Sequence, residues 1–204
     1  MSGMWAKMRK NLLQMPIDSK EDDFTQIEDN LYLGNISFAQ NQHSMNKYNI
    51  SLIIGVYPKN LINIALQMIP SNCRFHHINV KDSPSEDLIS HFDKCFDLIT
   101  EEIDENGGNV FVFCGAGISR SATIVASYLM RKHSIGCDEA IERIKALRRK
   151  INPNQGFLGQ LKLYEEMGCR LVRTNPEYRL FSLLVLKKSY KMSNLFQLLI
   201  GFKF

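Results

Sequence analysis

One stretch of the sequence decides the fold: Val110-Phe111-Val112-Phe113-Cys114-Gly115-Ala116-Gly117-Ile118-Ser119-Arg120-Ser121. A run of β-forming apolar residues ends at a cysteine, a loop of small residues follows, and an arginine then enters a helical segment. This order places a thiol at the end of a buried strand, with the N–H groups of a tight loop around it. Arg120 can reach back over that loop. The arrangement suits a doubly charged oxyanion such as phosphate, held against a sulfur nucleophile.

The composition is that of an ordinary globular protein with one domain and short extensions. The 204 residues include 45% hydrophobic and 23% charged residues, and the net charge is +4. This charge is modest, so no nucleic acid partner is expected. Five cysteines show no disulfide framework, which indicates a reducing compartment. We therefore expect a cytoplasmic location, with the nucleus as a second one.

Both ends of the chain are predicted to be extensions of a domain that covers residues 23–168. Residues 1–22 lack the apolar core of a signal peptide, and we expect them to be flexible. Residues 169–204 end in an apolar stretch, 194–202, which is too short to span a bilayer. We expect a docked or disordered tail, with weak membrane contact as the alternative.

Strand and helix patterns alternate along the domain, and the run 50–56 is typical of a strand buried on both faces. The alternation predicts an α/β fold in which helices flank a central, mainly parallel, twisted sheet. Ligands of such sheets bind at the carboxyl ends of the strands, where Cys114 lies. In chain order we predict a hairpin over 24–34, a helix capped by Ser37 and ending near Lys47, strand 50–56, helix 61–68 and strand 74–80. A helix that starts at Ser83-Pro84-Ser85-Glu86 and ends at Gly107-Gly108 follows, then the central strand, and then helices 121–132, 137–149 and 157–167.

The spacing of cysteine and arginine is weak evidence by itself, because a second pair, Cys137 and Arg143, has the same spacing. That pair lies in a helical pattern, has no glycine and encloses three acidic residues. Carboxylates raise the pKa of a thiol and repel phosphate, so Cys137 is interpreted as structural. The loop after Cys114 has two glycines and no acid, which favours the functional interpretation there.

The same stretch closely resembles the signature of the Cys-based protein phosphatases. Further motifs narrow the resemblance to the dual-specificity branch, and it extends from about residue 27 to residue 167. These motifs are Ala126-Ser127-Tyr128-Leu129-Met130, Asn152-Pro153-Asn154-Gln155-Gly156-Phe157, Gln160-Leu161 and Tyr164-Glu165. The resemblance implies a catalytic domain over 23–168 that hydrolyses phosphotyrosine and phosphoserine or phosphothreonine in proteins, without a cofactor.

The residues themselves assign the nucleophile and the phosphate site. Cys114 would attack as the thiolate, because the neutral thiol is a poor nucleophile. The guanidinium of Arg120 offers a planar fork for two phosphoryl oxygens, which lysine cannot copy. The remaining contacts to phosphate are expected from Gly115, Ala116, Gly117, Ile118 and Ser119.

Three further roles rest on the resemblance. Asp82 follows a predicted strand, at the position where the family carries its general acid; Glu86 and Asp87 are rivals by composition. Ser121 matches the hydroxyl that eases release of the cysteine sulfur. Asn154 would support the phosphate loop, and the alternative is an asparagine that only forms a turn.

One residue departs from the family pattern. The family normally has a histidine directly before the nucleophile, where it supports the loop and favours the thiolate. This chain has Phe113. We therefore expect Cys114 to ionise less readily and activity to be weaker at low pH.

Other functions are compatible with parts of the sequence. Phe113 and the apolar tail favour a weakly active or inactive, pseudophosphatase-like module that binds phosphoproteins, whereas the presence of Cys114, Arg120 and Asp82 argues against it. A phosphatase of phosphoinositides or RNA 5′ ends is a further alternative; lipid-directed relatives carry lysines inside the loop, whereas this loop has Gly115, Ala116 and Ile118, which disfavours that branch. A sulfurtransferase would not account for Asp82 or for the stretch Asn154-Gln155-Gly156-Phe157. Residues 145–150 are interpreted as a solvated helix end, with docking of acidic phosphoprotein or anionic lipid as the alternative. No metal site is expected from Cys73, His76 and His77, because adjacent strand residues point to opposite faces.

Overall fold

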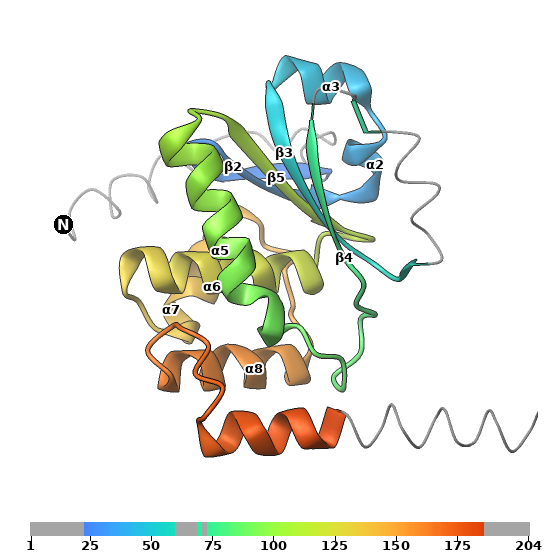
Figure 1. The fold of residues 1–204 in the computed structure, drawn as a ribbon. Coiled ribbons are helices and arrows are strands. Elements are labelled where there is room, and N and C mark those ends of the chain that lie inside the picture. Colours follow the sequence, from blue (N-terminus) through green and yellow to red (C-terminus); the bar gives the residue numbers. More distant parts are fainter. Residues whose placement is uncertain (1–22, 60–68, 71–72, 186–204) are drawn as a thin grey trace, which may run out of the picture.

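The structure is a computed structural model that describes residues 23–59, 69–70 and 73–185. Within these residues, five strands form one sheet in the order β1-β2-β5-β3-β4 (Figure 1). Strands β2, β5, β3 and β4 are parallel, and β1 pairs antiparallel with β2 at one edge. The predicted α/β fold with a mainly parallel sheet is confirmed. The strands are β1 (Phe24–Glu28), β2 (Leu31–Asn35), β3 (Ile50–Val56), β4 (Arg74–Ile78) and β5 (Asn109–Cys114).

Strand β5 lies in the middle of the sheet, between β2 and β3. Its side chains alternate between two cores, as strand geometry requires. Val110, Val112 and Cys114 face the larger core, whereas Phe111 and Phe113 face a smaller, aromatic one. The neighbouring strand β3 has the predicted bounds and is buried on both faces.

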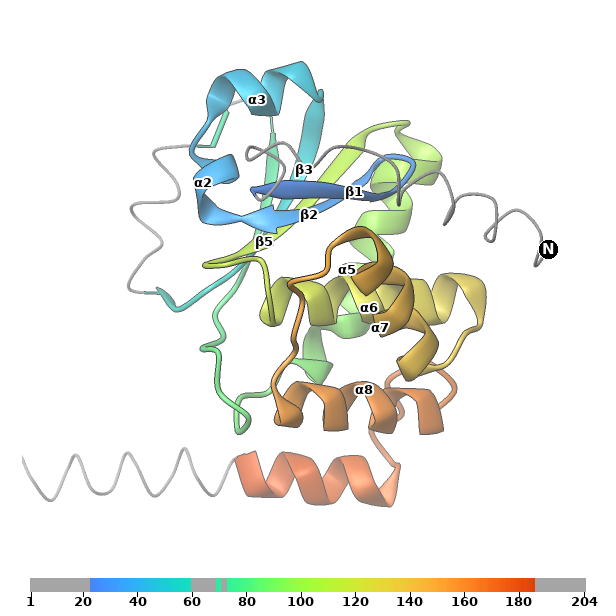
Figure 2. The ribbon, with the colours of Figure 1, turned by 180° about the vertical axis from the view of Figure 1, so that it is seen from behind.

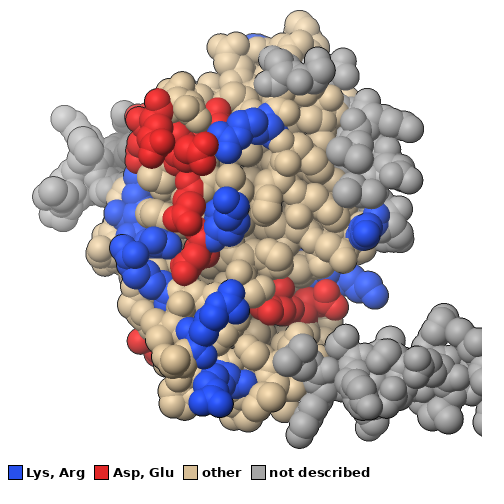
Figure 3. Space-filling model, in the orientation of Figure 1, with Lys and Arg blue, Asp and Glu red and all other residues tan. Residues whose placement is uncertain are grey.

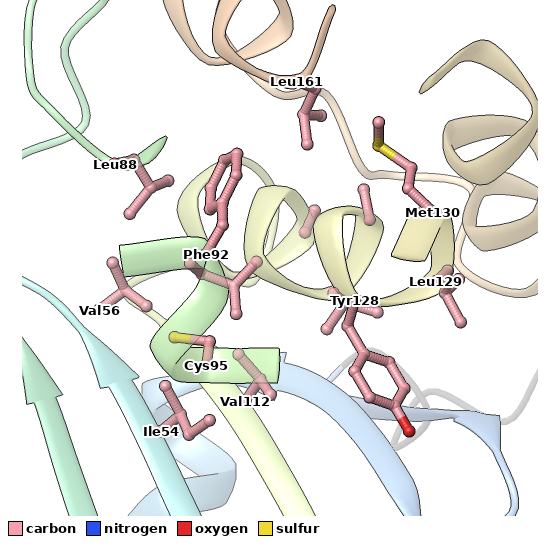
Figure 4. Close-up of a cluster of buried hydrophobic side chains, with 14 of the residues drawn as sticks. Ile54, Val56, Leu88, Phe92, Cys95, Val112, Tyr128, Leu129, Met130 and Leu161 are labelled. Atoms are coloured by element: carbon pink, nitrogen blue, oxygen red, sulfur yellow. The ribbon is translucent and has the colours of Figure 1, made fainter. Parts of the chain in front are cut away.

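Helices cover both faces of the sheet (Figure 2). The short helices α2 (Ile36–Ala39) and α3 (Gln42–Lys47) pack on the aromatic core. On the other face, α6 is buried along most of its length, from Ser121 to Met130. Figure 4 shows the larger core between the sheet, α5, α6 and α8. The helices on this face are α5 (Phe92–Thr100), α6 (Arg120–His133), α7 (Cys137–Leu147) and α8 (Gln155–Glu166), with the short turns η2 (Ile89–His91) and η3 (Glu101–Glu105) on either side of α5.

The helix predicted from Ser37 to Lys47 is wrong in its start and its continuity. Two short helices occupy this range, and asparagines cap both of them. The side-chain oxygen of Asn35 accepts from the N–H of Phe38 at 3.2 Å, and that of Asn41 accepts from the N–H of Ser44 at 3.0 Å. Asparagine competes for backbone N–H groups in this way, which starts a new helix at Asn41 and ends the first one before it.

The helix start predicted at Ser83 is also wrong. The first helical turn, η2, begins only at Ile89, and the carboxylate of Asp87 accepts from the N–H of Ser90 at 3.1 Å. The carboxylate of Glu86 instead accepts from the N–H of Lys81 at 3.1 Å. Beyond this point the prediction holds, because the helical region ends at Gly107, which has a φ of 63°. The helix predicted over 61–68 lies outside the described residues.

The chain after α8 packs back onto the domain. The N–H of Leu171 donates to the carboxylate of Asp93 at 2.9 Å. A helical segment over 176–185 follows, in which Tyr178 is buried in the larger core and Phe181 packs against it. Leu180, Leu183 and Leu184 of this segment are exposed. No helix within the described residues is long and apolar enough to cross a membrane, and the apolar tail 194–202 lies outside them.

Candidate active site

The cysteine and the arginine of the phosphate loop are placed by two different elements. Cys114 is the last residue of β5 and is 1% exposed, whereas Arg120 is the first residue of α6. A parallel sheet brings the ends of its strands to one edge, so Cys114 lies beside Asn35 at the end of β2. The loop 115–119 therefore closes over the edge at which open α/β sheets bind their ligands.

The sulfur of Cys114 has a hydroxyl partner. The side chain of Ser121 donates to Sγ at 3.2 Å, and both residues are buried. Because Ser121 lies in the first turn of α6, the positive end of the helix dipole is directed at the same region. Both features stabilise a negative charge on the sulfur.

The carbonyl groups of the loop are held from outside by backbone donors. The carbonyl of Gly115 accepts from the N–H of Ile36 at 3.3 Å, and that of Ile118 accepts from the N–H of Asn152 at 2.9 Å. In a trans peptide unit the N–H points to the side opposite the C=O. The N–H groups of Ala116 and Ser119, which belong to these units, are therefore directed away from the outer donors, as a cradle for an anion requires.

Arg148 holds the middle of the loop, a role that the sequence pattern does not predict. Its Nε donates to the carbonyl of Gly117 at 3.0 Å, and its Nη1 donates to the hydroxyl of Thr25 at 3.1 Å. Arg148 is only 3% exposed, so the interpretation of residues 145–150 as a solvated helix end is wrong at this position. Its place in a basic run concealed its role, because exposed Arg149 next to it has the same side chain.

Gly117 is required by its conformation and by its surroundings. Its φ is 65°, in the left-handed region that favours glycine. A Cβ at this position would lie 2.5 Å from the carbonyl oxygen of Gly34 in β2 and 2.8 Å from Nη2 of Arg148. The phosphate loop is thus packed backbone to backbone on β2.

Asp82 lies on the loop after β4 and meets Arg120 at the mouth of the site. Its Oδ2 is 3.4 Å from Nε of Arg120, an ion pair without hydrogen-bond geometry. The side chain of Arg120 is 12% exposed and that of Asp82 is 37% exposed. A Cβ at Gly115 would lie 3.5 Å from Nη2 of Arg120, so the guanidinium extends over the start of the loop.

Two polar side chains hold the other oxygen of Asp82. Oδ1 accepts from the hydroxyl of Ser119 at 2.8 Å and from the amide of Asn154 at 2.9 Å. Asn154 is also the N-cap of α8, because its Oδ1 accepts from the N–H of Phe157 at 3.0 Å. Asn154 therefore caps a helix and its side-chain amide holds Asp82, whereas its contact with the phosphate loop is made by its backbone N–H, which donates to the hydroxyl of Ser119 at 3.2 Å. Glu86 and Asp87, the rivals of Asp82 as general acid, accept instead from nearby backbone N–H groups, those of Lys81 and Ser90.

Phe113 points away from the sulfur of its neighbour. Its ring is fully buried on the aromatic face of the sheet, 5.7 Å from the ring of Phe111 and 5.6 Å from that of Tyr57. Gly55 on β3 leaves room for it, since a Cβ there would approach the Phe113 ring to 3.0 Å. The residue before the nucleophile is thus part of a core and not of the anion cradle.

Cys137 is a structural thiol with the properties expected of it. It is buried at the start of α7, and burial, followed by the charges of Asp138 and Glu165, raises its pKa to about 11. All five cysteines lie in described segments, and none of them forms a disulfide bond. No group of three or more His, Cys, Asp or Glu side chains in the described part of the chain could hold a metal ion.

One face of the molecule carries charges of both signs. On the face drawn in Figure 3, acidic and basic side chains of the described residues are interspersed. At the start of β4, Nη1 of Arg74 contacts Glu101 at 2.9 Å and Glu102 at 3.1 Å.

The site combines a thiol at the end of a parallel strand with a loop whose carbonyl groups bond outward and an arginine at the start of a helix. These features are those of a Cys-dependent phosphatase. The family model described as "Dual specificity phosphatase, catalytic domain" matches residues 31–167. The chain belongs to this family, so the predicted membership is confirmed, and the protein is a Cys-based protein phosphatase of the dual-specificity class.

Curated relatives agree with this assignment. Dual specificity protein phosphatase 1B of Arabidopsis thaliana is 34% identical over 145 residues, which cover 71% of this chain and 83% of that protein. Putative tyrosine phosphatase 123R of Invertebrate iridescent virus 6 is 43% identical, and the match covers 69% of this chain and 91% of that protein. For dual specificity protein phosphatase MPK-4 of Drosophila melanogaster, at 32% identity, the match covers 78% of this chain but only 40% of that protein.

Solved structures have the same fold. The human tyrosine phosphatase-like serine/threonine/tyrosine-interacting protein is 30% identical with a TM-score of 0.65, and the match covers 72% of this chain and 98% of that one. A mouse putative dual specificity phosphatase, complexed with zinc tungstate, is 28% identical with a TM-score of 0.64, and the match covers 76% and 93%.

Proposed function

We propose that this protein hydrolyses phosphotyrosine, phosphoserine and phosphothreonine in proteins through a phosphocysteine intermediate. The observation that carries this proposal is the meeting of three groups from separate elements at one edge of the sheet. Cys114 ends β5, Arg120 begins α6, and Asp82 follows β4, yet Asp82 and Arg120 are 3.4 Å apart. A nucleophile, a phosphate clamp and a proton donor are the groups that this reaction needs.

In the first step, the Cys114 thiolate attacks the phosphorus atom. The S–P bond forms while the bond from phosphorus to the leaving oxygen breaks, and Asp82 in its acid form gives its proton to that oxygen. Arg120 and the N–H groups of the loop stabilise the charge on the other phosphoryl oxygens.

In the second step, a water molecule attacks the phosphorus atom of the intermediate. The Asp82 carboxylate takes the proton of the water, and the P–S bond breaks to release inorganic phosphate. The Ser121 hydroxyl, 3.2 Å from the sulfur, stabilises the departing thiolate.

The test is turnover of phenyl phosphate and of a phosphotyrosine peptide by the full chain. We expect Cys114→Ser to abolish turnover and Asp82→Ala to lower it by about a hundredfold or more. Cys137→Ser is the matched control, since Cys137 has the same spacing to an arginine, and it should retain turnover. If the wild type has no more activity than Cys114→Ser at any pH, the proposed hydrolysis is wrong, and a module that only binds phosphoproteins becomes the better proposal.

A further inference from the structure

The segment that carries Asp82 is fastened to α8 by one buried amide. Gln160 is 2% exposed, and its Oε1 accepts from the N–H groups of both Leu88 and Ile89 at 2.8 Å. Its Nε2 donates to the carbonyl of Glu86 at 2.8 Å. A single side chain therefore satisfies three backbone groups within four consecutive residues.

Gln160 replaces the cap that this segment lacks. The N-cap of η2, Leu88, makes no side-chain cap hydrogen bond, and the first N–H groups of a helical segment have no partner inside it. Without Gln160, the N–H groups of Leu88 and Ile89 would be buried and unsatisfied, because both residues lie in the larger core. Figure 4 shows Leu88 in this core, together with Phe92 of α5 and Leu161 of α8.

Helix α8 touches the same segment at two other points. A Cβ at Gly156 would collide with the backbone oxygen and Cα of Pro84, so the two backbones are in direct contact. At the start of α8, the amide of Asn154 donates to Oδ1 of Asp82 at 2.9 Å. Residues 82–89 are thus held against α8 at three points along that helix, and Gln160 holds the end of the segment that is farther from the site.

We propose that Gln160 is a positioning residue for proton transfer by Asp82. This inference rests on the proposed function, in which Asp82 protonates the leaving oxygen. The amide fixes the backbone of 86–89, and that backbone fixes the direction in which Asp82 enters the site. The phosphate loop has its own supports, Ile36, Arg148 and Asn152, so attack by Cys114 does not depend on Gln160.

The inference predicts a loss that depends on the leaving group. A phenolate leaving group like that of tyrosine, with a pKa of about 10, needs protonation as it departs, whereas the much more acidic 4-nitrophenol does not. We expect Gln160→Leu to lower kcat/KM for phenyl phosphate about tenfold more than for 4-nitrophenyl phosphate. Gln160→Glu keeps the acceptor for the two N–H groups but replaces the donor to the Glu86 carbonyl by a second, repelling carboxylate oxygen, so we expect an intermediate loss.

Three comparisons test the route through Asp82. Gln155→Leu makes the same change at an exposed position of α8 and should leave both substrates unaffected. In an Asp82→Asn background, Gln160→Leu should add no further difference between the substrates, because the proton donor is already absent. The rate at which iodoacetamide alkylates Cys114 should be the same in Gln160→Glu and in the wild type.

Equal losses on both substrates in Gln160→Leu and Gln160→Glu would overturn the inference and leave Gln160 with a structural role. A full additional loss in the Asp82→Asn background would overturn it as well. If the wild type has no turnover that depends on Cys114, the proposed function fails and this inference fails with it. If the wild type turns over normally but Gln160→Leu leaves the ratio of kcat/KM for the two substrates unchanged, only the inference is overturned and the proposed function stands.

Discussion

Arg148 links the phosphate loop to strand β1 through contacts that a lysine cannot reproduce. Its Nε and Nη1 bond to Gly117 and Thr25 at the same time, and its planar guanidinium fixes the angle between the two bonds. By holding the carbonyl of Gly117, it turns the N–H of Ile118 to the opposite side of the peptide unit. Arg148 thus helps to direct a backbone N–H of the loop toward the bound anion, from the outer side of the loop.

We predict that Arg148→Met weakens inhibition by orthovanadate, a phosphate-like oxyanion, by about tenfold. A hydrogen bond to a charged group contributes about 1.5–3 kcal/mol, and part of this contribution reaches the bound anion through the loop. Arg149→Met, at the exposed neighbour, is the control and should bind vanadate as the wild type does. Equal inhibition constants for Arg148→Met and the wild type would contradict this role. Arg148→Lys should resemble Arg148→Met, because it lacks the fork.

Phe113 joins the nucleophile strand to the aromatic core, so a change there has two separable effects. We predict that Phe113→His lowers the free energy of unfolding by about 1–3 kcal/mol, because it places polar nitrogens among buried rings. At the same time, alkylation of Cys114 by iodoacetamide should become faster at low pH, because a histidine at this position favours the thiolate in the family pattern, although the Phe113 ring itself faces away from the sulfur. Urea unfolding measures the first effect, and the rate of alkylation against pH measures the second. Identical pH profiles for wild type and variant would show that Phe113 does not influence ionisation of the thiol.

At the scale of elements, α8 is a support for the loop that carries Asp82 as well as a core helix. Two of its glycines separate these roles. A Cβ at Gly156 would collide with the backbone of Pro84, whereas a Cβ at Gly159 would meet nothing within 4 Å. The first glycine permits a contact between elements, and the second only loosens the helix.

We predict opposite outcomes for the same substitution at these two positions. Gly159→Ala should raise the free energy of unfolding by about 0.5–1 kcal/mol, the usual gain for alanine over glycine inside a helix, and should leave activity unchanged. Gly156→Ala should push the 82–89 segment away from α8 and lower turnover of phenyl phosphate at least tenfold, a loss that general acid catalysis can account for. Urea unfolding and steady-state kinetics measure the two effects. Wild-type turnover in Gly156→Ala would refute the contact.

At the scale of the whole molecule, buried thiols make the free energy of unfolding decrease at alkaline pH. Burial raises the pKa of Cys95 and Cys137, to about 12 and about 11. In the unfolded chain a cysteine titrates near pH 8.5. The folded state therefore holds these protons more tightly, so their stabilisation is complete below about pH 8.5 and is lost as the pH rises toward the folded values.

We predict that the free energy of unfolding falls between pH 8 and pH 10, and that Cys137 contributes about 1–2 kcal/mol of the fall. The variant Cys137→Ala should show a correspondingly shallower decline, whatever its stability at pH 8. Urea unfolding at both pH values measures the slope. Parallel declines in the wild type and the variant would mean that Cys137 ionises at an ordinary pH in the folded protein.

The sequence by itself was sufficient for the fold class, for strand β3 and for the strand, loop and helix around Cys114. These features are encoded locally: apolar runs mark buried strands, and glycines followed by an arginine mark the loop and the helix start. The sequence also separated Cys114 from Cys137, because glycines and acidic residues differ within a few positions of each thiol. Local signals of this kind do not need the rest of the chain.

Tertiary structure alone decided how the loop is supported and where the 83–89 segment turns. The pattern at Ser83 predicts a helix, but contacts with Gly156 and Gln160, far along the chain, hold these residues in another conformation. Arg148 and Arg149 are equivalent in sequence, yet only Arg148 is buried under Gly117. The physical reason is the same in both cases: buried backbone groups must find partners, and those partners are chosen by packing between distant segments.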